Sequence, residues 1–510
     1  MQHNYHVLFS DFHSNIHHDQ IKDFQDWYLH AQKVLDFWAV AYYPYGMRVA
    51  EGKMAVEDLY PEAEIQADWE ILRTCLSEMQ DPDFPVFLGY EWQGAGLDGD
   101  HNVFFKEDGR MIHPKRYSEL CQNVDREAIG IPHHLAYKKG HRGKNWETHD
   151  ETFSPAAEIF SSHGSSESGY TDLPMHRHIH MGPRTGGTSV FNGLMQGRRI
   201  GVIASGDNHI VPGVFGNGYA AVLAKDKSKE AIWEALTKRH VYGVSANKIL
   251  LDYRANGHLM GDVITDHGGE IVHEVFARAG DAISRIELIK NNVVFKTYTH
   301  NGSWEFEPLK ETERFKFKIE FGWGPNTKVF KEHVKRQWSG RLKTVGKIIS
   351  IENCFTAPGQ DLKCNKENEA EFTLTTYKST QTGKWMGPSP VTLEGFIFEI
   401  EAPVSSDIEL EIDGRTFHKP VKEILEDTDV IVLYDEAKEL VKEKFDLEEF
   451  YRSDPFYHNA YKVRIMRGTP SAGYNAHCRF TVPVEEGDRY YMVKVYQRNG
   501  ELAWSSPVFL

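Results

Sequence analysis

The segment Gly201-Val-Ile-Ala-Ser-Gly-Asp-Asn-His209 joins a buried strand to two side chains that can bind a metal. Ile200 to Ala204 is apolar without polar alternation, which is typical of a short strand covered on both faces. The run breaks at Ser205-Gly206 and then delivers Asp207 and His209 with one residue between them. If the backbone stays extended, that spacing puts both side chains on the same side. A carboxylate and an imidazole together suit a borderline divalent metal, although a lone Asp-x-His is more often a simple turn.

The same arrangement recurs in the first 245 residues. Other apolar strand-like segments there border possible ligands or tyrosines, namely Asp11 and His13, Tyr42 and Tyr43, Glu91, His101, His133 and His134, and His163. Helical patterns at about 21–33, 61–79, 188–198 and 228–238 separate these segments, so the region is predicted to be an α/β domain with a mainly parallel sheet. Functional groups gather at the carboxyl ends of strands in such domains. A single buried histidine is usually a satisfied core residue, but the recurrence favours a metal site.

The pattern changes after residue 246. Short alternating strands such as 248–253, 270–276, 285–290 and 490–496 take over, with turn residues between them. Such spacing predicts an antiparallel, sandwich-like region. Residues 423–449 are acidic and predicted to be a partly helical insertion. We therefore expect two domains, 1–245 and 246–510, the second supporting the site in the first.

The composition excludes several classes of protein. A net charge of −16 over 510 residues argues against nucleic acid or an anionic membrane as the main partner. The five cysteines form no Cys-x-x-Cys, so neither a disulfide framework nor a cysteine zinc site is indicated. No signal peptide and no apolar run of membrane-spanning length is visible. We expect a cytoplasmic protein that acts on a small molecule.

Several motifs carry a resemblance to a known superfamily. Asp11-Phe-His-Ser-Asn15 is similar to the D-L-H-x-H opening of the PHP (polymerase and histidinol phosphatase) superfamily, and the whole chain resembles the DUF3604-type PHP-like proteins of unknown function. The other matching stretches are 89–92, 99–103, 132–134, 158–167, 204–209, 231–236 and 502–507. The resemblance implies a distorted (β/α)7 barrel that binds up to three divalent metals. Known PHP proteins hydrolyse phosphate esters or serve polymerases.

The resemblance also implies a set of metal ligands, with gaps. Asn15 stands where the family has a second histidine, and Ala41-Tyr42-Tyr43 occupies the place of T-D-H. Asparagine and neutral tyrosine are weak ligands, so we expect one or two ions of Zn, Mn or Fe rather than three. His17, His18 and Asp19 lie close enough in sequence to replace the missing ligands. The implied ligands are His13, Glu91, His101, His133 or His134, His163, Asp207 and His209.

A metal of this kind lowers the pKa of bound water from 15.7 to about 7 and so supplies hydroxide at neutral pH. Glu91, His134 and Asp207 are the predicted catalytic residues, with Glu91 bridging two metals by resemblance. Substrate anions need further donors, and the candidates are Lys138, Lys139, Arg142 and Arg184, with Lys144 nearby. A solvated basic loop explains each lysine taken singly equally well. Tyr42 and Tyr43 are predicted to line the pocket.

Three functions fit these residues. The first is a metal-dependent hydrolase, a phosphoesterase that acts on a small anionic substrate. The second is a metal-dependent hydrolase or lyase acting on a carbohydrate or carboxylic derivative, for which Trp323, Trp338, Trp385 and Trp504 offer sugar-stacking surfaces. The third is a non-catalytic binding protein with a decayed site, against which the retention of Glu91, Asp207 and His209 argues.

Overall fold

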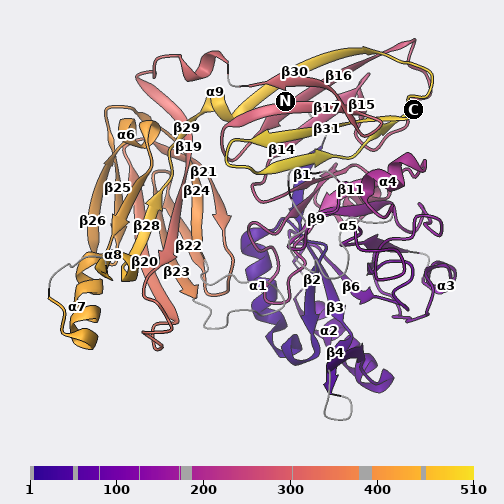
Figure 1. The fold of residues 1–510 in the computed structure, drawn as a ribbon, viewed down its shortest axis with the longest axis horizontal. Coiled ribbons are helices and arrows are strands. Elements are labelled where there is room, and N and C mark those ends of the chain that lie inside the picture. Colours follow the sequence, from indigo (N-terminus) through magenta and orange to yellow (C-terminus); the bar gives the residue numbers. More distant parts are fainter. Residues whose placement is uncertain are drawn as a thin grey trace. The chain divides into compact units, whose positions relative to one another are not determined.

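The computed structural model describes residues 5–49, 55–79, 81–125, 127–169, 171, 173, 187–300, 302–377, 393–448 and 455–510 (Figure 1). Contacts between Cα atoms divide the chain into two units. The first contains residues 1–278, 284–300 and 476–510, and the second contains residues 279–283 and 301–475. The boundary expected at residue 245 lies inside the first unit.

The first unit contains a mixed sheet whose strand ends carry the candidate ligands. Its order is β2 (Ser14–His17), β3 (Trp38–Tyr43), β6 (Val86–Trp92), β7 (His101–Phe105) and β8 (Ala128–Pro132). The first three strands are parallel, whereas β7 runs antiparallel to both of its neighbours. Helices α1 (Phe24–Val34), α2 (Glu62–Glu78) and α3 (Tyr117–Asn123) lie in the connections, and the short strands β4 (Tyr45–Val49) and β5 (Ala55–Leu59) pair with each other.

A second, smaller sheet carries the Gly201–His209 stretch. In it β9 (Ala156–Ser161) lies between β10 (Gly164–Ser165) and β11 (Gly201–Ala204), and β9 and β11 are parallel. The helix α4 (Val190–Met195) precedes β11, and a parallel bridge joins Ser14 to Asn208. The strand predicted at Ile200 to Ala204 is therefore present, and all four residues of β11 are buried.

Two further sheets belong to the first unit, and the larger of them brings the two ends of the chain together. The larger has the order β1 (His6–Ser10), β12 (Tyr219–Ala224), β13 (Val241–Val244), β32 (Leu502–Ser505), β31 (Tyr490–Gln497), β17 (Ile283–Lys290) and β18 (Val293–Thr299), with β33 (Val508–Phe509) beside β31. The other contains β15 (His258–Leu259), β14 (Leu250–Ala255), β16 (Glu270–Arg278) and β30 (Asn475–Pro483). The C-terminal strands, drawn in yellow, thus belong to the same unit as the N-terminal strand (Figure 1).

Helix α5 (Lys229–Thr237) illustrates how the local sequence sets these elements. Ser228 caps it by accepting a hydrogen bond from the Ala231 N–H, and Ile232 and Leu236 at helical spacing are buried. The apolar run 34–41 predicts a strand, and here the structure differs. Residues up to Val34 continue α1, and the strand begins only at Trp38, because Val34 faces the core as part of the helix.

The core of the first unit is aromatic and aliphatic. Phe12 packs edge-on against Phe37 and Phe104 at ring-centroid distances of 5.8 and 5.5 Å. The helices and strands of this unit confirm the predicted mixed α/β class. The described strands pair as several separate sheets, in which β7 and β12 run antiparallel to their neighbours, and this pairing does not show the predicted distorted (β/α)7 barrel.

The second unit is a pair of antiparallel sheets. The first sheet has the order β21 (Lys347–Cys354), β24 (Glu394–Pro403), β19 (Thr312–Trp323), β28 (Tyr461–Ile465) and β27 (Asp429–Val432), with β29 (Thr469–Pro470) beside β19. The second sheet has the order β22 (Asp361–Lys366), β23 (Glu369–Tyr377), β20 (Lys335–Thr344), β25 (Asp407–Ile412) and β26 (Arg415–Pro420). Phe321 of the first sheet packs against Trp338 and Phe372 of the second, so the sheets face each other across a shared core. Helices α6 (Val421–Glu426), α7 (Tyr434–Phe445), α8 (Pro455–Asn459) and α9 (Ser471–Tyr474) complete this unit.

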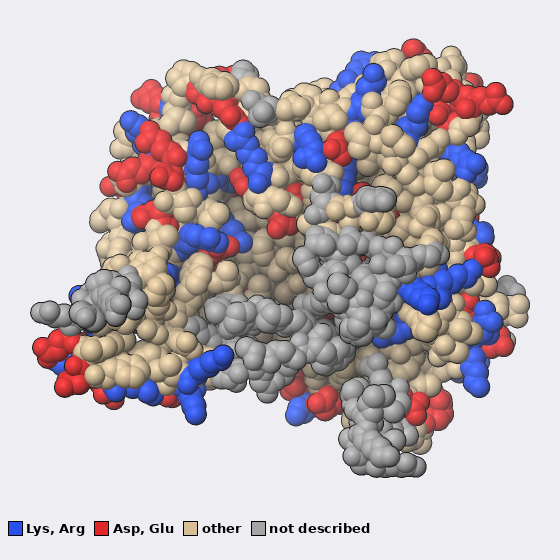
Figure 2. Space-filling model, viewed as in Figure 1, with Lys and Arg blue, Asp and Glu red and all other residues tan. Residues whose placement is uncertain are grey.

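The tryptophans considered for sugar stacking give that hypothesis little support. Trp338 and Trp504 are buried and belong to cores, and Trp323 is half-buried. Trp385 lies outside the described residues. On the face drawn in Figure 2, the lysines and arginines of the described residues are interspersed with aspartates and glutamates. Within the described ranges, no helix is both long enough and apolar enough to span a bilayer.

A buried carboxyl group makes the stability of the second unit depend on pH. Glu394 accepts hydrogen bonds from the Thr356 N–H and hydroxyl, and burial raises its pKa to about 8. The pKa of this carboxyl group is therefore higher in the folded state than in the unfolded state. The protonated group contributes fully to stability below the unfolded-state pKa. This contribution is lost at about 1.4 kcal/mol per pH unit as the pH rises toward the folded-state pKa. We expect Glu394→Gln to remove this slope between about pH 4.5 and 8. Urea unfolding of both proteins across that range measures it, and parallel slopes would contradict the prediction.

Candidate metal centre

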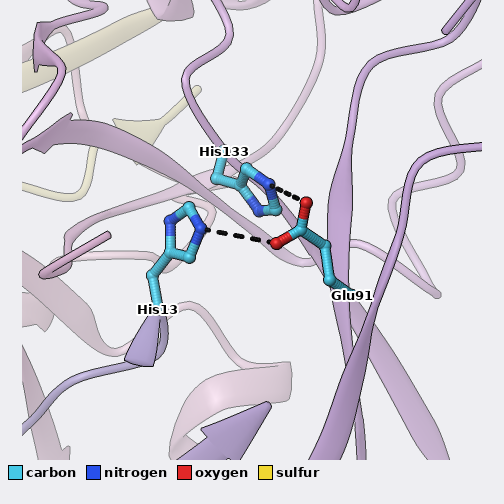
Figure 3. Close-up of side chains that lie close together, drawn as sticks. All are labelled: His13, Glu91 and His133. Atoms are coloured by element: carbon cyan, nitrogen blue, oxygen red, sulfur yellow. Dashed lines mark ion pairs between the residues drawn. The ribbon is translucent and has the colours of Figure 1, made fainter. Parts of the chain in front are cut away.

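Two groups of buried side chains have the composition of metal ligands. The first comprises His13, which precedes β2, Glu91 of β6, and His133, which follows β8; their ligand atoms lie within 4.8 Å of one another (Figure 3). Glu91 Oε2 is 3.9 Å from His13 Nε2, and Glu91 Oε1 is 3.8 Å from His133 Nε2. Both separations exceed hydrogen-bond length. The carboxylate and the two rings therefore face one another without a direct bond.

The second group comprises Asp100, His133 and His134. His134 Nε2 is 3.5 Å from Asp100 Oδ2. The two rings meet nearly at right angles, at 78°, with centroids 4.5 Å apart, so consecutive residues present nitrogens in different directions. The sequence left open which histidine of this pair is the ligand. The structure brings His133 into both groups and His134 into one.

Asp207 connects the Gly201–His209 stretch to the first group. Its Oδ1 is 3.5 Å from His13 Nε2, and its Oδ2 is 2.6 Å from His163 Nε2. His209 Nε2 lies 3.7 Å from Asp207 Oδ1, with 18% of the His209 side chain exposed, so this imidazole borders the centre. Burial opposes ionisation of Asp207, but the neighbouring His13 and His163 hold its pKa well below the usual range.

Buried polar side chains fix the orientation of the first group. Glu158 accepts a hydrogen bond from His13 Nδ1 at 2.8 Å, which turns His13 Nε2 toward Glu91 and Asp207. Asn15 Nδ2 donates to Glu91 Oε2 at 2.8 Å, and Gln93 Nε2 donates to Glu91 Oε1 at 2.9 Å. Partners of this kind orient metal ligands and raise their affinity. Asn15 therefore supports Glu91 from the position where the family pattern has a histidine.

The protonation states of Glu91 and His133 suit a cation. Burial raises the pKa of Glu91, but His133, His13 and Arg142 outweigh it and lower that pKa to about 2. Burial also lowers the pKa of His133, as does the nearby His13, so this ring is neutral and able to coordinate. His13 behaves differently. Burial lowers its pKa, but the surrounding Asp207, Glu158 and Glu91 raise it to about 10, which reflects the excess of negative charge around the ring.

Orphaned polar atoms show that a metal fits. Neither ring nitrogen of His133 has a hydrogen-bond partner among the described residues, and the same holds for His134 Nδ1 and Asn15 Oδ1. His133 is only 1% exposed. Buried polar atoms without partners are rare, and an ion is one of the standard explanations. The imidazole and carboxylate groups are ligands that borderline divalent metals accept.

Comparisons with known proteins find distant similarity over part of the chain. No family model matches the chain. An uncharacterized protein of Chlamydia pneumoniae is 25% identical over 270 residues, which are 47% of this chain and 43% of that protein. An uncharacterized protein of Chlamydia trachomatis is 26% identical over 204 residues, 36% of this chain and 32% of that protein. The match thus spans less than half the length of these relatives.

A solved structure is similar to part of this chain. It is a two-domain protein from Bacteroides vulgatus, described as containing a predicted PHP-like metal-dependent phosphoesterase. The two proteins share 14% sequence identity, and the TM-score is 0.32. The similar region covers 58% of this chain and 86% of the Bacteroides protein. The family resemblance of the motifs stays a prediction.

His101 is a predicted ligand that the structure does not bring to either group. The strand pairing sets His101 opposite Trp92 and Asn102 opposite Glu91, so His101 and Glu91 project from opposite faces of the sheet. The His101 ring stacks on Tyr117, its Nδ1 donates to the Gly99 carbonyl, and its Nε2 is 3.1 Å from Lys144 Nζ.

Tyr42 and Tyr43 also point in opposite directions. The Tyr42 hydroxyl donates to Asp68 Oδ2 at 2.5 Å, and His18 Nδ1 contacts the same oxygen at 2.7 Å, both at the flank formed by α2. Tyr43 instead packs against His17 and His209, with ring centroids 4.6 and 5.2 Å away. His17 Nε2 is 2.6 Å from His209 Nδ1. Only Tyr43 of the two tyrosines thus lies beside a candidate ligand.

The basic loop after β8 supplies one cation to the centre. Arg142 Nε donates to Asp100 Oδ2, and its Nη2 is 3.7 Å from Glu91 Oε1. Lys138 is exposed, Lys139 forms a surface ion pair with Glu147, and Lys144 is buried beside His101. Arg184, like His176, His178 and His180, lies outside the described residues.

Two residues of the candidate centre were not predicted from the sequence. Asp100 stands next to His101 in the stretch 99–103, and the strand register, which the sequence does not give, places Asn102 rather than His101 opposite Glu91. Glu158 lies in the stretch 158–167, and its carboxylate accepts a hydrogen bond from His13. An acidic residue inside an otherwise apolar strand was the available signal.

Proposed function

We propose that this chain is a metal-dependent phosphoesterase that hydrolyses a small anionic substrate. The observation that carries the proposal is His133, a buried imidazole that faces Glu91 and has no hydrogen-bond partner for either ring nitrogen among the described residues. Burying carboxylates without a compensating charge is costly. A divalent ion held by His13, Glu91 and His133, with Asp207 beside it, would supply that charge.

The residues of the chain have separable roles in this proposal. When bound, a divalent metal supplies a Lewis acid that activates water at neutral pH and polarises a phosphoryl oxygen. Glu158 keeps His13 Nε2 directed at the centre, and Asn15 holds the Glu91 carboxylate in place. His134 is neutral because burial holds its pKa well below the usual range, and its Nδ1 has no hydrogen-bond partner among the described residues.

Arg142 is the side chain proposed to attract the anionic substrate. Its guanidinium lies beside the carboxylates of Glu91 and Asp100, and 23% of the side chain is exposed. Arginine binds phosphoryl oxygens through planar, paired N–H groups. Lys138 and Lys139 stand on the exposed side of the same loop and would act only through their charge.

Metal content and turnover test the proposal together. The protein is purified without added metal, analysed for bound elements, and assayed with 4-nitrophenyl phosphate and bis(4-nitrophenyl) phosphate. We expect bound Zn, Mn or Fe, loss of turnover after chelation, and recovery when the ion is returned. Wild-type protein that contains no metal and takes up none of the three would refute the proposal. Metal-dependent turnover of sugar or carboxylic esters alone would move the function to the second hypothesis.

A further inference from the structure

Arg142 contacts a carboxylate from each of the two candidate ligand groups. Its Nε donates to Asp100 Oδ2, the same oxygen that lies 3.5 Å from His134 Nε2. Its Nη2 is 3.7 Å from Glu91 Oε1, the oxygen that faces His133. The guanidinium therefore lies between the carboxylates of the two candidate groups. Asp100 is completely buried, and the guanidinium is a cation in direct contact with its carboxylate.

The loop holds Arg142 in this position. The backbone of Arg142 has a φ of 67°, in the left-handed region, and its N–H donates to the Gly96 carbonyl at 2.8 Å. Gly143 follows, where an added Cβ would meet the Tyr137 carbonyl, and its N–H donates to the Lys138 carbonyl at 3.2 Å. A non-glycine residue in the left-handed region costs about 1–3 kcal/mol and persists only where its surroundings impose it. The position of Arg142 is thus built into the tight turn after β8.

We propose that Arg142 replaces the second metal ion, so that the centre binds one divalent cation at His13, Glu91 and His133. The Asp100–His133–His134 group is then held by the guanidinium. This inference rests on the proposed function, and it specifies how that site distributes its positive charge. A fixed guanidinium beside a single metal provides two cations for an anionic substrate, the arrangement that two metal ions provide in other phosphoesterases.

Counting metal ions tests the inference without relying on turnover. Chelated wild-type protein is reloaded with Mn²⁺, desalted and analysed for bound metal, and its electron paramagnetic resonance spectrum is recorded. We expect about one equivalent and the signal of isolated Mn²⁺. Arg142→Met is expected to bind about two equivalents and to give the spin-coupled signal of neighbouring ions, because Asp100 loses its cation.

Matched variants separate this effect from a general change in charge. Lys139→Met removes a positive charge from the same loop, but its partner Glu147 lies at the surface, so the variant should bind metal as the wild type does. Asp100→Asn added to Arg142→Met should restore a single equivalent. Arg142→Gln repeats the test with a polar residue in case the methionine variant does not fold.

The outcomes distinguish the inference from the proposed function. Two equivalents in the wild type, unchanged by Arg142→Met, would overturn the inference and leave the proposed function standing. One equivalent in both the wild type and the Arg142 variants would also overturn it. A wild type that binds no Mn²⁺, Zn²⁺ or Fe²⁺ would overturn the proposed function, and the inference with it.

Discussion

Replacing His133 by Gln is expected to lower metal affinity by more than about 100-fold and to abolish metal-dependent turnover. His133 belongs to both candidate ligand groups, and its two buried ring nitrogens have no other partner among the described residues. Losing residues that only orient ligands already costs about 10–100-fold in affinity, so losing a ligand should cost more. Isothermal titration with Zn²⁺ or Mn²⁺, followed by a phosphoester assay, measures both effects.

His101→Gln is the matched control for this variant. It makes the same replacement at a buried histidine of the neighbouring strand, and the glutamine oxygen can still accept a hydrogen bond from Lys144. Because His101 projects from the opposite face of the sheet to Glu91, the variant should bind metal with wild-type affinity. Equal losses in the two variants, or a loss confined to His101→Gln, would contradict the placement of the centre.

The contrast between His101 and His133 shows what the sequence could and could not predict about the site. Ligand-type residues at strand ends pointed to a buried centre, and His13, Glu91, His133 and Asp207 do lie together. Sequence spacing cannot say which face a residue occupies when a strand runs antiparallel to its neighbours, as β7 does. Shifting by one residue exchanges the two faces of a strand. For that reason the sequence pattern predicts His101 as a ligand, whereas its neighbour Asp100 belongs to a candidate group in the structure.

Pairing across long sequence distances was the other feature that local patterns could not provide. The strand periodicity of the C-terminal region was visible, but nothing in it indicates that β31 and β32 complete a sheet begun by β1 and β12. The position of Glu167 depends on this pairing, because Lys494 and Trp504 both contact its carboxylate. The stretches 158–167 and 502–507 thus meet in space although more than half of the chain separates them.

Replacing Glu167 by Gln is expected to lower the free energy of unfolding of the first unit by roughly 3–5 kcal/mol, as is typical when a buried charge loses its partner. Lys494 is 2% exposed, and its Nζ lies 2.8 and 3.1 Å from the two carboxylate oxygens of Glu167. Glutamine keeps an acceptor for the Trp504 indole but removes the negative charge that lies against the buried ammonium group. Urea unfolding followed by fluorescence measures the change.

The double variant Glu167→Gln/Lys494→Met separates the charge effect from a loss of packing. Methionine fills a space similar to that of the lysine stem without its charge, so the double variant should recover much of the stability lost by Glu167→Gln. Metal stoichiometry at saturation should stay at the wild-type value in both variants, since His13, Glu91 and His133 lie on other segments. A double variant as unstable as the single one would show that Glu167 acts by shape. Loss of metal from the folded variants would show instead that the C-terminal strands hold the centre itself, through the segment that joins Glu167 to His163.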